Sequence, residues 1–256
     1  MKRNACTSYF TRSVAVGLAA ALIAFSATIA TLANAAGDPA SAHVQQRILP
    51  PRNPGVVPNI GGLYGWLGAK WWQWAFSFPA PSIPFFNQGG PVDIGAGQSG
   101  PVWFLAGANG GLTSPRTGVV PTGKFLFFPM ANLINDYPCP PSFGFEPNPD
   151  EPLEDFLQRT ADEFFPAITD LFAQVDGNSL SNLANYRAMS DMFTFTGDPA
   201  ATSFDPCIIG KPQNGVAVGY WLLLAPLPPG THRLHFGAHS WGQDVTYVLT
   251  VKPGHN

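Results

Sequence analysis

The hydrophobic pattern predicts a first helix in the segment that begins at Leu63. Apolar or long side chains recur there at steps of three and one residues, on one side of a helix: Leu63, Trp66, Leu67, Lys70, Trp71 and Trp74. Tyr64, Trp72 and Phe76 lie off that stripe, so most of the circumference is apolar, as is typical of a buried core helix. The alternative is a sugar-stacking platform made by Trp71, Trp72 and Trp74, because indole rings offer flat apolar faces with a polar edge.

A second helix is predicted from Leu153 to Val175. Its apolar residues fall at three- and four-residue steps, and the acidic residues on the remaining faces are interpreted as solvated. Pro166 removes an interior hydrogen bond, so we expect a kink or a split into two helices there. Asp176-Gly177 follows between apolar residues, which predicts a tight turn in a short hairpin.

The remaining apolar runs predict strands. In the last run, Val245, Tyr247, Leu249 and Val251 alternate with polar or smaller residues, so one face is expected in the core. Phe125–Phe128 and Tyr220–Leu224 are apolar on both faces, as expected of central strands covered on each side. The strand candidates are Val102–Gly107, Lys124–Met130, Asp191–Thr196, Val216–Leu224, His232–Gly237 and Asp244–Val251.

Composition agrees with a β-rich fold. The chain has 27 Gly and 27 Pro and only 11% charged residues, which disfavours a helical bundle and suits short strands joined by turns. We predict a mainly β, single-domain fold over residues 63–256, a two-sheet β-sandwich of the jelly-roll or immunoglobulin-like kind with two helices packed on it. The proline-rich residues 36–62 are expected to form an extended N-terminal segment.

The N-terminus predicts export. Lys2, Arg3 and Arg12 precede an alanine-rich apolar run, and Ala33-Asn34-Ala35 offers a signal-peptidase site, so residues 1–35 are interpreted as a cleaved signal peptide. A retained membrane anchor is the alternative, because the run approaches the length of a membrane span. Cleavage would leave no stable membrane insertion and a secreted or periplasmic protein.

Charge restricts the partners. All 16 acidic residues follow residue 35, whereas three of the 13 Lys and Arg residues precede it, which gives the mature chain a net charge of −6. Binding of a phosphate backbone needs clustered basic residues, and the sequence has no basic run. We therefore expect no nucleic-acid partner.

Two cysteines remain after cleavage. Cys139 and Cys207 would both be exported to a compartment in which disulfides persist, so we predict that they pair. Two reactive thiols in the unfolded, unreduced protein would contradict this pairing. A structural zinc site would need four ligands, and no supporting histidine cluster is evident.

The sequence that follows the strand near Phe127 is rich in amide and carboxylate groups and is predicted to be a loop. A ligand pocket is the hypothesis there, with amides and a carboxylate bonding hydroxyl groups while an indole ring stacks on a sugar. The candidate residues are Trp103, Asn132, Asn135, Asp136 and Tyr137. The same Asn and Asp side chains could instead cap turns. Hydrolysis of a glycoside would need a second acid, for which Asp93, Asp191 and Asp244 are candidates.

Two other motifs are weaker. Ala238-His239-Ser240-Trp241-Gly242 resembles a hydrolase nucleophile elbow, but too little chain follows it to supply the helix and the acid and histidine partners. His232 and His235 would point to opposite faces of a strand, which disfavours a shared metal. We expect no metal and no cofactor.

One further group of segments comprises Trp71–Trp74, Gly97–Gly107, Val120–Lys124, Phe127–Pro129, Tyr220–Trp221, Pro228–His232 and Asp244–Tyr247. Together these segments resemble a family of uncharacterised secreted proteins of bacteria and archaea. The likeness spans most of residues 63–251 and implies export and a β-rich fold, but it brings no established activity and no catalytic residue. Many members carry cysteines where this chain has Ile94 and Gly118, so a disulfide expected in the family would be missing here.

Two classes of function are therefore predicted. The first is a non-catalytic exported protein that binds a polysaccharide or another polar small ligand through an aromatic and amide site. The second is a polysaccharide-active hydrolase or lyase that uses Asp136 with a second acid. The first is favoured because aromatic and amide groups are abundant, whereas no pair of carboxylates stands at a recognisable spacing.

Overall fold

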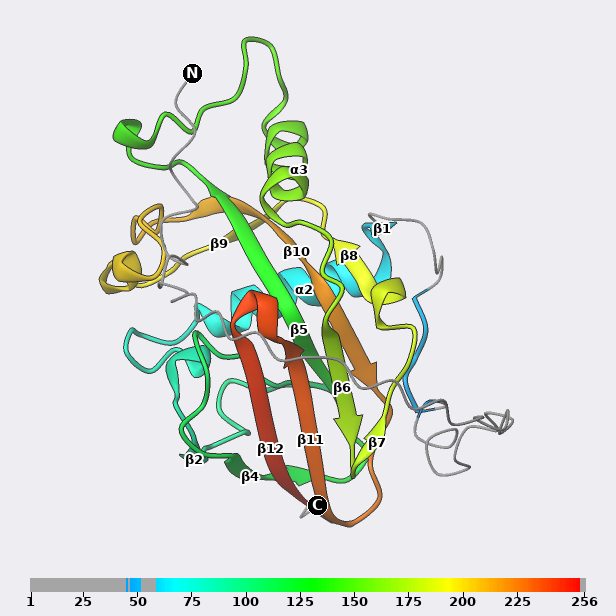
Figure 1. Ribbon diagram of the computed structural model, residues 1–256. Helices are drawn as coiled ribbons and strands as arrows, with labels where there is room; N and C mark the ends of the chain where they lie inside the picture. The colour runs from blue at the N-terminus through cyan, green and yellow to red at the C-terminus, as the bar shows by residue number, and fades with distance from the viewer. Residues whose placement is uncertain (1–44, 46, 52–58, 254–256) are drawn as a thin grey trace, which may run out of the picture.

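The computed structural model describes residues 45, 47–51 and 59–253 and forms a two-sheet β-sandwich with two α-helices (Figure 1). The predicted fold class is confirmed. The predicted signal peptide, residues 1–35, lies outside the described residues. Within the described part of the chain, no helix has the length and apolarity needed to cross a membrane.

Sheet A has six strands in the order β1-β8-β10-β5-β3, with β9 paired to β10. Its core is the long antiparallel pair of β5 and β10, while β3 pairs in parallel with the first residues of β5 only. The strands are β1 (Asn59–Ile60), β3 (Val102–Phe104), β5 (Phe125–Tyr137), β8 (Arg187–Met189), β9 (Phe193–Phe195) and β10 (Gln213–Leu224).

Sheet B has six strands in the order β2-β4-β12-β11-β6-β7. Pairing is antiparallel between β12, β11, β6 and β7, and parallel between β2, β4 and β12. The strands are β2 (Gly90–Pro91), β4 (Arg116–Pro121), β6 (Leu171–Val175), β7 (Asn178–Ser179), β11 (Gly230–Ala238) and β12 (Gln243–Lys252).

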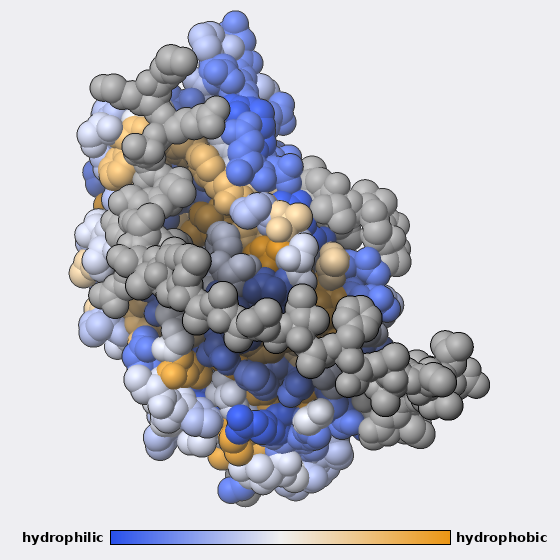
Figure 2. Space-filling model, in the orientation of Figure 1, coloured by the Kyte–Doolittle hydropathy of each residue, from blue (hydrophilic) through white to orange (hydrophobic). Residues whose placement is uncertain are grey.

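The two faces of sheet A have different covers, as Figure 1 shows. Helix α2 (Gly62–Ala75) packs on the face that carries Trp221, whose ring centroid lies 5.7 Å from that of Trp71. Sheet B packs on the opposite face, where Phe128 and Phe236 have centroids 4.4 Å apart. Helix α3 (Leu153–Phe164) covers the end of that face beyond sheet B, and Figure 2 shows hydrophilic residues over this end of the molecule.

The strand predictions are largely confirmed. In β12 the alternation places Val245, Tyr247, Leu249 and Val251 in the core, with 0–4% of each residue exposed. The pair β5 and β10 is buried on both faces, as the continuous apolar runs predict. The 175–180 hairpin is also present, as β6 and β7 joined by Asp176-Gly177.

The second predicted helix is wrong in its C-terminal half. Helix α3 ends at Phe164, and Leu171–Val175 forms β6, which pairs with β11. Pro166 biases the preceding residue away from helical angles, and Phe165 has φ −109° and ψ 87°. The apolar spacing of residues 171–175 also fits a strand, in which Ala173 and Val175 are buried.

The first predicted helix is present as α2, but the predicted stripe was wrong at its beginning. Leu63 and Trp66 are 47% and 56% exposed, whereas Tyr64, Leu67 and Trp72 are buried. The helix can lie directly on β8 because Gly65 has no side chain. A Cβ atom there would stand 2.3 Å from the carbonyl oxygen of Met189.

The predicted extended segment, residues 36–62, is described only in part. Ile48 is buried and forms an antiparallel bridge with Leu224, and Tyr64 donates a hydrogen bond to the carbonyl of Leu49. Helix α2 begins at Gly62, one residue before the predicted boundary.

Candidate functional site

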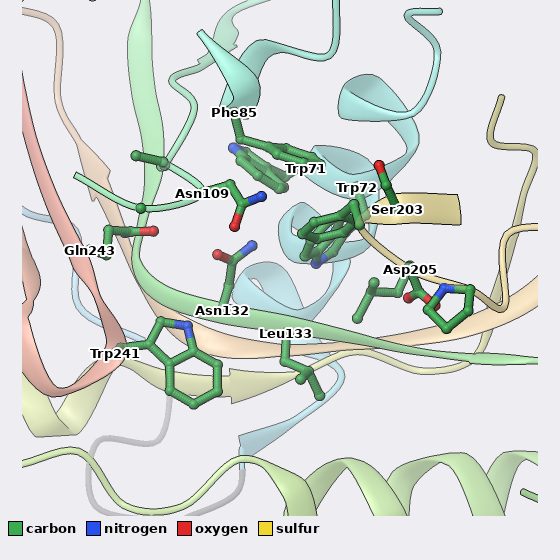
Figure 3. A pocket seen from close by; sticks show the side chains of 16 residues that line it. Trp71, Trp72, Phe85, Asn109, Asn132, Leu133, Ser203, Asp205, Trp241 and Gln243 are labelled. Carbon is green, nitrogen blue, oxygen red and sulfur yellow. The ribbon is translucent and has the colours of Figure 1, made fainter. Parts of the chain in front are cut away.

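A cavity of about 400 Å³ lies at the edge of sheet A, where β5 continues past its pairing with β3. Helix α2, the 107–110 loop, the start of β12 and the 203–206 segment converge there, so residues distant in sequence share one space (Figure 3). The lining residues are Trp71, Trp72, Phe85, Gly107, Ala108, Asn109, Gly110, Asn132, Leu133, Ile134, Ser203, Phe204, Asp205, Pro206, Trp241 and Gln243.

Aromatic rings from α2 and two loops form one wall of the cavity. Trp71 and Trp72 meet edge to face with centroids 4.9 Å apart, and Phe85 and Phe204 pack beside them. The indole nitrogen of Trp71 donates to the carbonyl of Leu105 at 2.9 Å. That of Trp72 is buried without a hydrogen-bond partner among the described residues, although only 3% of Trp72 is exposed. This wall therefore contains one buried donor that is unsatisfied.

Side-chain amides supply the polar groups of the site. Asn109 and Asn132 point toward one another from the 107–110 loop and from β5 (Figure 3). The Nδ2 atom of Asn132 is buried and has no hydrogen-bond partner in the described part of the chain. Gln243, at the start of β12, donates from Nε2 to the carbonyls of Pro129 at 2.6 Å and Met130 at 2.8 Å, so it fixes the edge of β5 to sheet B.

A pair of aspartates lies at the 203–206 wall: Asp205 lines the cavity, and Asp136 lies behind it. One carboxylate oxygen of Asp136 and one of Asp205 lie within 4.8 Å of each other. Burial raises the pKa of Asp136 well above its ordinary value, and the neighbouring Asp205 raises it further. Burial also raises the pKa of Asp205. The backbone N–H of Cys207 opposes this rise, because it donates a 2.9 Å hydrogen bond that stabilises the charged carboxylate. We infer that Asp136 holds a proton and Asp205 carries the charge.

The disulfide secures this wall. Cys139 and Cys207 are bonded, as predicted, and both are buried. Gln213 donates hydrogen bonds to the Asp136 carboxylate and, at 3.0 Å, to the carbonyl of Cys207. Because Asp136 and Asp205 flank the two cysteines in sequence, the bond between the cysteines also brings the two carboxyl groups together.

The opposite wall is held by a buried cation. Arg116, on β4, is 1% exposed, and its Nη1 atom donates to the carbonyls of Ala106 and Gly107 at 2.9 and 2.8 Å and to the hydroxyl of Tyr247 at 2.9 Å. Its other nitrogens donate to Asn87. No carboxylate pairs with Arg116 in the described residues. Its charge is therefore stabilised by carbonyl oxygens, among them that of Gly107 in the cavity wall.

The structure brings only part of the sequence-predicted site together. Residues 132–137 are not a loop, because β5 runs on to Tyr137 against β10. Asn132 lines the large cavity, and Asp136 lies in a neighbouring pocket of about 40 Å³ that Asp205 also lines. Trp103 pairs in register with Leu126, six residues before Asn132, which is roughly 20 Å along the strand.

The other predicted site residues make structural contacts. Asn135 is buried on the α3 side of sheet A and donates to the carbonyl of Leu157 at 2.8 Å and the hydroxyl of Thr160 at 2.6 Å. The Tyr137 hydroxyl donates to Glu146 at 2.6 Å. Trp103 lies 5.6 Å from the ammonium group of Lys124. Within the described chain these three residues do not line the cavity.

The weaker motifs form other contacts. The Ser240 hydroxyl donates to Asp170 at 2.6 Å, so a carboxylate and not a histidine is its partner. His232 and His235 contact Asp176 and Asp244 separately, at 2.7 and 2.8 Å. In the described chain, the one group with metal-ligand spacing is Asp136, Asp205 and Cys207, and Cys207 has no thiolate to offer because it is in the disulfide.

Sequence reasoning missed Asn109, Asp205, Trp241 and Gln243 as cavity residues. They come from three separate segments, and their proximity depends on how the two sheets pack. A signal for Asp205 was present, since Asp136 and Asp205 lie three and two residues before the cysteines predicted to be bonded. Trp71 and Trp72 belonged to the sugar-stacking alternative for the first helix.

Comparison of the chain with protein-family models, with curated proteins and with solved structures gives no match. The resemblance drawn from the sequence motifs therefore stays a prediction. The structure places the two positions that differ from that family in contact, because a Cβ atom on Gly118 would stand 2.4 Å from Cδ1 of Ile94.

Proposed function

We propose that this protein is exported and binds a glycan unit, or a polar ligand of similar size, in the cavity between α2 and β5 without catalysing a reaction. The support is the combination of an aromatic wall with two buried N–H donors, Nε1 of Trp72 and Nδ2 of Asn132, that have no partner among the described residues. An unsatisfied buried donor costs about 1–3 kcal/mol, which a ligand oxygen would recover.

The shape of the site suits a sugar. Among the aromatic lining residues, Phe204 and Trp241 are half-buried and offer apolar surface for the C–H face of a pyranose. Asn109 and Asn132 offer donors and acceptors for its hydroxyl groups. A volume of about 400 Å³ lies within the usual range for small-molecule sites.

Glycan-array screening followed by isothermal titration calorimetry tests this proposal. We expect Asn132→Leu to weaken the binding of a hit about tenfold, because one hydrogen bond of about 1.4 kcal/mol is lost. Asn185→Leu, on the surface and away from the cavity, is the matched control and should leave affinity unchanged. Trp103→Leu tests the site first predicted from sequence; if it abolishes binding while Asn132→Leu does not, the cavity is not the site.

A hydrolase or lyase is the second candidate, and one observation favours it. Asp205 supplies the second carboxyl group that the sequence could not place beside Asp136. Against it, Asp136 lies in a pocket of about 40 Å³, room for a few water molecules rather than a sugar ring. We expect bound oligosaccharides to be recovered intact; release of reducing ends that Asp205→Asn abolishes would establish the enzyme instead.

A further inference from the structure

The charge of the cavity distinguishes among ligands. Among the described residues, Asp205 is the one titratable side chain in its lining, and the smaller pocket behind it adds only Asp136, since its two cysteines are bonded to each other. No Lys, Arg or His of the described part of the chain lines either space. A ligand that carries an anionic group would meet a carboxylate without a compensating cation.

The geometry around Asp205 leaves its charge unbalanced. One carboxylate oxygen accepts the backbone N–H of Cys207 at 2.9 Å, and the neighbouring carboxyl group is that of Asp136. Asp205 forms no ion pair with a described residue. A partly buried carboxylate without a cationic partner is a place where a ligand cation gains both Coulomb energy and a hydrogen bond.

The rest of the cavity points the same way. Trp72 and Phe204 line the cavity together with Asp205, and the centroids of the two rings lie 6.3 Å apart. Aromatic faces attract an ammonium group. The unpartnered donors of Trp72 and Asn132 need oxygen acceptors, which an ammonium group does not provide. The complementary molecule therefore combines an ammonium group with hydroxyl oxygens.

We propose that the cavity selects an amino sugar, whose ammonium group pairs with Asp205 while its hydroxyl oxygens accept hydrogen bonds from Asn132 and Trp72. This inference rests on the proposed function, because it names the class of sugar bound at the same site. A mature net charge of −6 also favours the approach of a cationic ligand.

Three tetrasaccharides of similar size serve as probes: the glucosamine tetramer, the N-acetylglucosamine tetramer and cellotetraose. Calorimetry on the full-length mature chain, at a pH at which the amines are protonated, should show the glucosamine tetramer binding at least about tenfold more tightly than the other two. Equal or tighter binding of a neutral tetramer overturns the amino-sugar inference and leaves the proposed function standing. Failure of all three to bind overturns both.

A variant locates the preference. Asp205→Asn should remove the advantage of the glucosamine tetramer while retaining the weaker binding of the neutral ones, because the amide still accepts the Cys207 N–H. Asp155→Asn, an exposed residue of α3, removes the same charge far from the cavity and should retain the preference. If Asp205→Asn does not fold, the wild-type protein decides: the preference must fall as salt rises, and a salt-independent preference overturns the ion pair.

Discussion

At the residue scale, Asp136 shows how burial turns an ordinary acid into a structural group. Its pKa is raised by burial and by the neighbouring Asp205, so the folded protein binds a proton that the unfolded chain has released above about pH 4. The folded state gains stability from this proton at low pH and loses it as the pH rises toward the folded pKa.

Asp136→Asn removes this pH dependence. The amide nitrogen can donate to Asp205 as the protonated acid does, and the amide oxygen can still accept from Gln213. We expect the variant to be at least as stable as the wild type at pH 8 and to show a smaller fall in the free energy of unfolding between pH 5 and pH 8, measured by urea titration. Asp155→Asn should keep the wild-type slope. An unchanged slope in Asp136→Asn would contradict the shared proton.

Arg116 is the second residue with a testable role. Arg116→Lys lacks the planar guanidinium group that donates hydrogen bonds to Ala106, Gly107 and Tyr247 together. We therefore expect the unfolding free energy to fall by about 2–3 kcal/mol. Because these carbonyls precede the 107–110 wall, ligand affinity should fall as well. Arg159→Lys, exposed on α3, should change stability by less than about 1 kcal/mol. Equal effects of both substitutions would show that Arg116 does not hold the wall.

At the scale of single elements, short-range pattern explains β12 and β10 but not β5 and β6. The alternation in β12 and the continuous apolar run of β10 each predict a strand. The spacing of residues 171–175 fits a helix or a strand, and pairing with β11 makes this segment a strand. Asn132, Asn135 and Asp136 have loop-forming side chains, yet pairing with β10 keeps them in β5, and their alternation puts Asn135 against α3 and Asp136 toward Asp205.

Strand β4 lies very close to the chain segment that precedes it, where Gly118 meets Ile94. Gly118→Ala would place a Cβ atom 2.4 Å from Cδ1 of Ile94 and 2.9 Å from the carbonyl oxygen of Val92, so backbone must move. We expect unfolding free energy to fall by about 1–3 kcal/mol. Gly111→Ala, where a Cβ meets no atom within 4 Å, is the matched control. Thermal melts of the two variants should therefore differ; coincident melts would refute the close contact.

At the scale of the whole molecule, the disulfide joins the end of β5 to the segment that walls the cavity. It closes a loop of 68 residues, for which chain entropy gives about 4 kcal/mol of stability before strain is subtracted. Cys139→Ser with Cys207→Ser should lower the unfolding free energy by up to this amount, in urea titrations with and without reductant. Reductant should lower the unfolding free energy of the wild type but not that of the double variant. An equal loss in the variant would show that this disulfide is not the bond whose reduction destabilises the protein.

Fold class, disulfide and most strands could be predicted because they depend on local pattern and on the presence of two cysteines after residue 35. The cavity could not, because Trp72, Asn109, Asn132, Asp205 and Trp241 meet only after α2 and both sheets have packed. Local pattern also placed Trp103 beside Asn132, whereas the parallel register of β3 separates them.

The most direct test of the account is a ¹H–¹⁵N spectrum of the protein during titration with the glucosamine tetramer and cellotetraose. The indole N–H of Trp72 and the side-chain amide of Asn132 report on the two donors that await an acceptor. We predict that both signals shift with saturation while the indole signal of Trp103 stays in place. Unchanged Trp72 and Asn132 signals in the presence of a ligand that demonstrably binds would contradict the account.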